Sequence, residues 1–178
     1  RCLWRCVHGL SVAVGGGAVG DVLLDVPVVW MGAPWEVGVA GTCARATIPL
    51  GGWAQRVRRP VAIADAIGLA VFVALGTRES LGMGMSDFVA VVMGVVTGIV
   101  GGIIRDVLAN RTPIILRKEV YALAALCGAA LFVLADGLGA AAGVGLWLSM
   151  AVVLAIRLLA IFYNWSIPTF RIEPTDRG

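Results

Sequence analysis

The sequence predicts an all-α integral membrane protein that consists of an inverted repeat of three-helix units and a final helix, with about six membrane spans. Three observations predict this class. The 178 residues are 60% hydrophobic and 14% charged, with a mean hydropathy of +0.94, whereas a soluble domain has about 45–50% apolar and about 25% charged residues. Apolar stretches long enough to cross a bilayer follow one another along the chain. A glycine-rich motif ending in aspartate occurs twice.

The composition also excludes several classes of protein. The apolar content is too high for a disordered chain, and four cysteines in 178 residues are too few for a disulfide-stapled secreted domain. A net charge of +3 does not suggest a nucleic-acid partner. Cys2 and Cys6 lie near His8, but no fourth ligand is visible, so we expect no metal site and no cofactor. Because the chain has a single histidine and no nucleophile motif, we do not expect an enzyme.

The spans are found by dividing the chain at charge clusters, prolines and glycine-rich turns. Five stretches are apolar over most of their length, and a sixth, at the start of the chain, contains three consecutive glycines. In chain order the six are Val7–Leu24, Val28–Leu50, Val61–Gly82, Asp87–Ala109, Val120–Ala135 and Ala140–Tyr163.

The charges between the spans predict the orientation. If the spans alternate in direction, ten basic residues fall on one side of the membrane and one on the other. The basic side receives Arg1, Arg5, Arg56, Arg58, Arg59, Arg111, Arg117, Lys118, Arg171 and Arg177. The opposite side receives Arg78 together with Asp25, Glu79, Asp87 and Asp136. Because positive loops stay in the cytoplasm, we expect a multi-pass protein of the cell inner (plasma) membrane with a cytoplasmic C-terminus.

The internal repeat pairs Val12–Leu23, which reads VAVGGGAVGDVL, with Thr97–Leu108, which reads TGIVGGIIRDVL. Five of the twelve positions are identical, including the two glycines and the aspartate of the Gly-Gly-x-x-x-Asp pattern. The second copy begins three spans after the first. An odd number of spans reverses the direction of the second copy, so we expect an inverted-topology repeat of the kind found in many transporter folds.

A complete first repeat needs three helices, but only two precede residue 51, so we expect a chain that is truncated at its N-terminus. The expected organisation is 1–50 as an incomplete first repeat of two helices, 51–60 as a basic cytoplasmic loop, 61–135 as the second three-helix repeat, 136–165 as the final transmembrane helix and 166–178 as a cytoplasmic tail.

The repeated glycines, Gly15-Gly16-Gly17 and Gly101-Gly102, lie inside spans. Glycine weakens a helix and allows close backbone approach, and broken backbone at membrane depth is tolerated only where it is buried or lines a watery cavity. We interpret the two motifs as half-broken helices that line a permeation path. Plain helix packing, the expected role of Gly94 and Gly98, is the alternative.

Ionisable residues within spans are costly, so they usually pair or face water. Here they are Asp21, Asp65, Arg105, Asp106 and Arg157. An aspartate opposite an arginine would form a charge network that holds a gate, or would offer oxygen atoms to a passing cation; a structural ion pair or snorkelling to the interface is an equally good interpretation. Lys118 opens the fifth span, where it would either tune ion entry at a pore mouth or mark the membrane interface.

Several of these motifs resemble those of the prokaryotic TRIC-type (trimeric intracellular cation channel) family, which is also catalogued as the bacterial glycine transporter domain family. The likeness covers nearly the whole chain. It is carried by Ala64-Asp65-Ala66-Ile67-Gly68, the run Thr97–Leu108, Pro113, Arg117-Lys118-Glu119-Val120-Tyr121-Ala122, and Arg157-Leu158-Leu159-Ala160 with Trp165 and Pro168.

The resemblance implies a seven-helix protomer, a homotrimer embedded in membrane lipid, and a pore for potassium or another monovalent cation in each protomer, framed by the two glycine-rich helices. It also leaves secondary transport of glycine or another small amino acid as an alternative. Gly20 stands where the family has an arginine before the aspartate. That departure and the missing span keep a third hypothesis open, a non-conducting membrane subunit.

Overall fold

The structure is a computed structural model that describes residues 15, 17–24, 27, 42, 58–108, 110, 113, 115 and 120–163, with side chains omitted at 58–61 and 142. Four long helices make up most of this part. They are α4 (Arg58–Gly82), α5 (Asp87–Leu108), α6 (Val120–Gly137) and α7 (Ala142–Phe162). Residues 17–23 are also helical, as is Gly15, and this described stretch is called the short helix below. The predicted all-α class is confirmed.

The long helices agree closely with four of the predicted spans. The main difference is that α4 begins at Arg58 rather than at Val61, because Pro60 falls in the first turn, where a helix tolerates a missing backbone N–H. Part of the predicted loop 51–60 is therefore helical. The predicted span Val28–Leu50 lies outside the described residues, apart from Thr42.

Tight turns join α4 to α5 and α6 to α7. Gly84 and Gly139 follow the helix ends with φ of 75° and 73°, a conformation that residues with a side chain rarely adopt. After α4, Gly84 N–H donates to the carbonyl of Leu81, and Met85 N–H donates to that of Ser80. The equivalent pair of bonds follows α6. This pattern is the Schellman motif, which satisfies the last carbonyls of a helix while reversing the chain.

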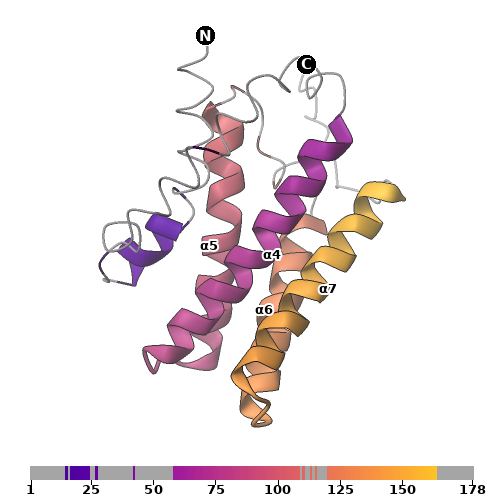
Figure 1. Cartoon of the computed structure of the whole chain (residues 1–178). Helices are drawn as coiled ribbons and strands as arrows, with labels where there is room; N and C mark the ends of the chain where they lie inside the picture. Colours follow the sequence, from indigo (N-terminus) through magenta and orange to yellow (C-terminus); the bar gives the residue numbers. More distant parts are fainter. Residues whose placement is uncertain are drawn as a thin grey trace, which may run out of the picture.

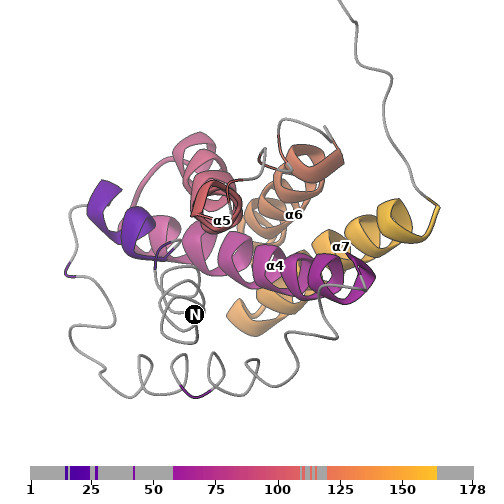
Figure 2. The same ribbon diagram turned by 90° about the horizontal axis from the view of Figure 1, so that it is seen from above.

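The result is two antiparallel hairpins, α4–α5 and α6–α7, packed side by side (Figure 1). Helix α4 crosses the middle of the group and contacts each of the other three long helices (Figure 2). The shared core contains Leu69, Ala70, Val73, Ile99, Tyr121, Ala124, Ala125, Ala129 and Val153. Its many small residues let helix backbones approach closely, which is how helices associate in a membrane, where no hydrophobic force drives them together.

Three of the described helices, Asp87–Leu108, Val120–Gly137 and Gly143–Phe162, are long and apolar enough to cross a membrane. Helix α4 carries Asp65 near its start and Arg78 and Glu79 near its end. Large apolar side chains cover the outside of the bundle; Phe88, for example, is 78% exposed. Such a surface matches lipid and not water, and the chain is a multi-pass membrane protein.

The two glycine-rich segments lie against each other in opposite directions. A Cβ atom added at Gly15 would lie 2.9 Å from Ile104 Cδ1, and one added at Gly20 would lie 2.5 Å from Thr97 Oγ1. Residue numbers therefore rise along one segment while they fall along the other. This antiparallel arrangement is the one that the inverted repeat predicts.

The expected break at Gly101-Gly102 is wrong. Helix α5 is continuous from Asp87 to Leu108 and passes through both glycines. In the first copy Gly15 and Gly17 are helical, and Gly16 lies outside the described residues. Packing explains the continuity: the glycines are small enough to let neighbouring helices approach, so their helix need not open.

Candidate functional site

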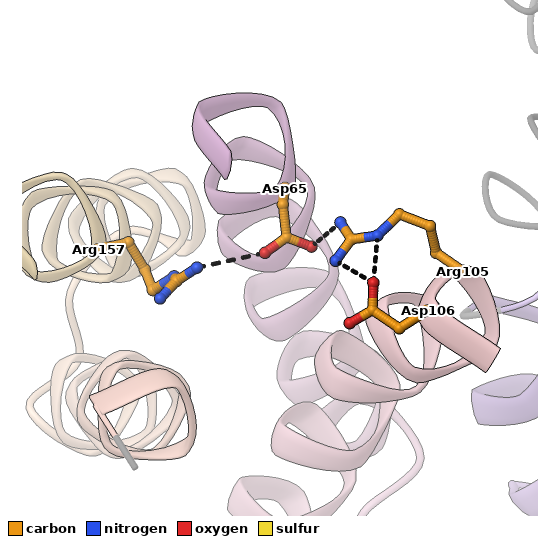
Figure 3. A network of polar contacts seen from close by, with 4 residues as sticks. All are labelled: Asp65, Arg105, Asp106 and Arg157. Atoms are coloured by element: carbon orange, nitrogen blue, oxygen red, sulfur yellow. Dashed lines mark hydrogen bonds and ion pairs between the residues drawn. The ribbon is translucent and has the colours of Figure 1, made fainter. Parts of the chain in front are cut away.

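Asp65 lies between two arginines from different helices (Figure 3). Its Oδ1 atom accepts a hydrogen bond from Arg105 Nη1 at 2.5 Å, and its Oδ2 atom accepts one from Arg157 Nη2 at 3.3 Å. Arg105 in turn donates from Nε to Asp106 Oδ1 at 3.0 Å, and its Nη2 lies 2.9 Å from the same oxygen. The four side chains form one continuous network, which we call the Asp65 network.

The hairpin topology brings this network together. Asp65 lies near the start of α4, Arg105 and Asp106 lie in the last turn of α5, and Arg157 lies near the end of α7. In an up-and-down bundle these ends share one side of the molecule. The start of α6 is also at this side, where the ring of Tyr121 lies 4.5 Å from the guanidinium carbon of Arg157. All four long helices therefore contribute to the site.

The network is buried and balanced in charge. The exposed fraction of the side chain is 3% for Arg157, 5% for Asp65, 8% for Asp106 and 20% for Arg105. Removing an ion from water costs several kcal/mol even after relaxation. Two carboxylates facing two guanidinium groups offset that cost within the cluster. The snorkelling interpretation is wrong for Arg157, since its side chain is directed into the bundle.

Gly102 forms one wall of the site. A Cβ atom there would lie 2.6 Å from the Tyr121 hydroxyl oxygen and 3.5 Å from Asp65 Oδ1. Only a glycine lets the tyrosine and the aspartate approach α5 at this point. The close approach explains the glycine in this structure better than the helix break that the sequence predicted.

A narrow hollow lies beside Gly102, and it is too tight for a water-sized sphere. Its lining combines the α5 end of the network with the start of α6 and the connection between them. The lining residues are Ile99, Gly102, Ile103, Arg105, Asp106, Pro113, Ile115 and Tyr121. This hollow therefore leaves no room for a water molecule beside the network.

The remaining predicted site residues lie elsewhere. Asp21 is 5% exposed and lies in the short helix, so it is not one of the four side chains that define the Asp65 network. Gly17 faces Phe72, since a Cβ there would lie 3.6 Å from the ring. Gly101 is buried in α5. Lys118, like Gly16, lies outside the described residues.

The sequence did not predict the contact of Tyr121, although this residue is part of the Arg117–Ala122 motif. Its position just after a basic cluster, at the start of a span, was the available signal. Its contact with Arg157, 36 residues later, is decided by the packing of α6 on α7.

In the described part of the chain no three histidine, cysteine, aspartate or glutamate side chains gather in a way that would hold a metal ion. Cys2, Cys6 and His8, the one set considered from the sequence, lie outside that part.

Comparison with known proteins identifies the family. The chain is 39% identical to the inner membrane protein YadS of Escherichia coli, a UPF0126 protein, over 96% of this chain and 84% of the relative. A family model described as glycine transporter matches residues 62–137. A solved structure of a TRIC cation channel superposes with a TM-score of 0.82 at 33% identity, over 96% of this chain and 84% of that one. The chain belongs to the TRIC/UPF0126 family.

A second TRIC structure gives the same fold. The TRIC trimeric intracellular cation channel orthologue from Rhodobacter sphaeroides superposes with a TM-score of 0.83 at 31% identity, over 92% of this chain and 94% of that one. The agreement extends over most of both chains, so the hairpins belong to a TRIC-type fold.

Proposed function

We propose that this chain conducts monovalent cations, with potassium as the principal ion, and that the Asp65 network is the closed gate of its pore. The observation that carries the proposal is the pairing of Asp65 with both Arg105 and Arg157 within a fold similar to TRIC cation channels. Buried ionisable groups in a membrane are costly and usually mark an ion path.

The charges suggest how such a gate works. With both arginines on Asp65, each carboxylate oxygen already accepts a hydrogen bond from a guanidinium group, and the two positive charges repel a cation. If Arg105 moves away with Asp106, its other partner, Asp65 gains a free oxygen on the side of α5. A carboxylate oxygen at a narrow point can replace part of the hydration shell of a cation.

Potassium flux into proteoliposomes tests this function. We expect flux from the unaltered chain, and we expect Asp106→Asn to change it several-fold, because Arg105 then keeps only Asp65 as a partner. Asp136→Asn is the matched control, since Asp136 is an exposed carboxylate at the far end of α6. No flux from the unaltered chain, or equal changes in both variants, would contradict the proposal.

Secondary transport of glycine is the second candidate. It is supported by the family model that matches residues 62–137 and by the antiparallel glycine-rich segments. Saturable uptake of labelled glycine that collapses with the ion gradient would favour it over a channel. Uptake equal to that of empty vesicles would eliminate it.

We further propose a homotrimer with one pore in each protomer and a cytoplasmic C-terminus. The likeness to a trimeric TRIC channel supports the assembly, and the ten-to-one sorting of basic residues supports the orientation. On this orientation the Asp65 network lies toward the cytoplasm. Mass measurement in detergent tests the trimer, and labelling of an added C-terminal cysteine by an impermeant reagent tests the orientation.

A further inference from the structure

Thr97, near the middle of α5, has a buried hydroxyl without a partner. The residue is 5% exposed, and within the described part of the structure its Oγ1 atom makes no hydrogen bond. A buried hydroxyl without a partner destabilises the folded protein, and valine has nearly the same shape without this cost. An unsatisfied buried polar group therefore calls for a reason, such as a bound ion or water.

Two other hydroxyls in the bundle show the usual arrangement. Thr77 Oγ1 donates to the carbonyl of Val73 at 2.8 Å, and Ser80 Oγ donates to that of Gly76 at 2.8 Å. Each bonds to the residue four positions earlier in its own helix, as serine and threonine do inside helices. Thr97 makes no such bond to α5, so its oxygen remains available to another ligand.

The Thr97 hydroxyl lies where three helices meet. A Cβ atom added at Gly20 would lie 2.5 Å from Oγ1, and one added at Gly76 would lie 3.0 Å from it. Gly20 belongs to the short helix and Gly76 to α4. Glycine at both positions leaves the oxygen in a slot between two backbones, and a small outward movement of the short helix would open that slot.

The slot lies on the face of α5 that also carries Arg105, a member of the Asp65 network. Thr97, Gly101 and Arg105 follow one another at spacings of four, so they share one face of α5. Thr97 is about 12 Å along the axis from Arg105. On the other side of the slot, Gly20 is followed directly by the buried carboxylate of Asp21. The hydroxyl thus lies beside the residue that precedes Asp21, about two turns along α5 from Arg105.

We propose that Thr97 Oγ1 is a coordinating oxygen for the permeating monovalent cation, at a constriction formed by α5, α4 and helix 17–23, and that it contributes to ion selectivity. The proposal rests on the proposed cation conduction. A neutral hydroxyl suits this role, because it replaces a water of hydration without binding the ion so tightly that it cannot leave.

Thr97→Val tests the proposal, since it removes the oxygen and keeps the shape. We expect potassium flux in proteoliposomes to fall several-fold and the potassium-to-sodium permeability ratio to change. Thr97→Ser keeps the hydroxyl, and it should retain the ratio. Thermal unfolding should show Thr97→Val to be at least as stable as the unaltered chain, because no hydrogen bond is lost.

Ser149→Ala is the matched control. Ser149 Oγ is also buried without a hydrogen bond, but it lies between α7 and α6, against Gly128. It should leave both flux and ratio unchanged. An unchanged ratio and flux in Thr97→Val would overturn the proposal, as would an equal effect of Ser149→Ala. If the unaltered chain conducts, such a result removes only the role of Thr97; if the unaltered chain carries no cation, the proposed function falls with it.

Discussion

Asp65 and Arg105, forty positions apart in the sequence, are joined by an ion pair of 2.5 Å between Oδ1 and Nη1. The same carboxylate reaches Arg157, 92 positions away, through its second oxygen. One aspartate thereby connects both helix hairpins. The stability of the bundle and its proposed gate depend on the same group.

Asp65→Asn should strongly destabilise the protein. The change leaves Arg157 buried with no opposite charge, and losing one partner of a buried ion pair costs about 3–5 kcal/mol. Denaturation of the detergent-solubilised protein measures this loss, with Asp136→Asn as an exposed control.

Adding Arg157→Gln to Asp65→Asn should recover part of the loss. The remaining pair, Arg105 with Asp106, is then balanced in charge. In a double-mutant cycle the combined effect should be smaller than the sum of the single effects. Strict additivity would show that Asp65 and Arg157 do not depend on each other.

Gly102→Ala should destabilise the site by crowding. The added methyl would lie 2.6 Å from the Tyr121 hydroxyl oxygen, and overpacking of this kind costs about 1–3 kcal/mol. Tyr121→Phe removes that oxygen, so it should recover part of the loss in the double variant. Gly68→Ala is the control, because no atom lies within 4 Å of the added methyl and alanine favours a helix by about 1 kcal/mol. A higher unfolding temperature for Gly68→Ala and a lower one for Gly102→Ala are expected; equal shifts would refute the role of crowding.

Gly20→Ala should separate the short helix from α5. A Cβ there would lie 2.5 Å from Thr97 Oγ1 and 3.0 Å from its Cγ2, and both atoms are absent in Thr97→Ala. We therefore expect Gly20→Ala to lower the unfolding temperature and the pair of changes to recover much of it. Gly17→Ala serves as control, since its methyl would meet only Phe72 at an ordinary 3.6 Å.

This contact also gives Gly20 a structural role. The sequence showed it only as the place where an arginine of the family is missing. In the folded chain the position is filled by the side chain of Thr97, which leaves little room for a larger residue. An arginine placed there would have to displace Thr97 or the helix itself.

The sequence alone was sufficient for the class of protein, for the four long helices within a few residues, and for the opposed direction of the repeats. These features follow from local signals: hydropathy sets the spans, glycines end α4 and α6, and the number of spans between the copies sets their relative direction. The sequence also supplied Asp65, Arg105, Asp106 and Arg157 as candidates, since charge inside an apolar span is visible without a structure.

Only the tertiary structure decided how these residues combine. It joined Asp65 to both arginines, placed Tyr121 on Arg157, kept α5 continuous through Gly101-Gly102 and left the Thr97 hydroxyl in a slot between two glycines. The physical reason is that a glycine that permits a close contact between helices and a glycine that breaks a helix occur in the same local sequence pattern. What distinguishes them is the side chain that a distant helix brings to that point, and its position depends on the packing of the whole bundle.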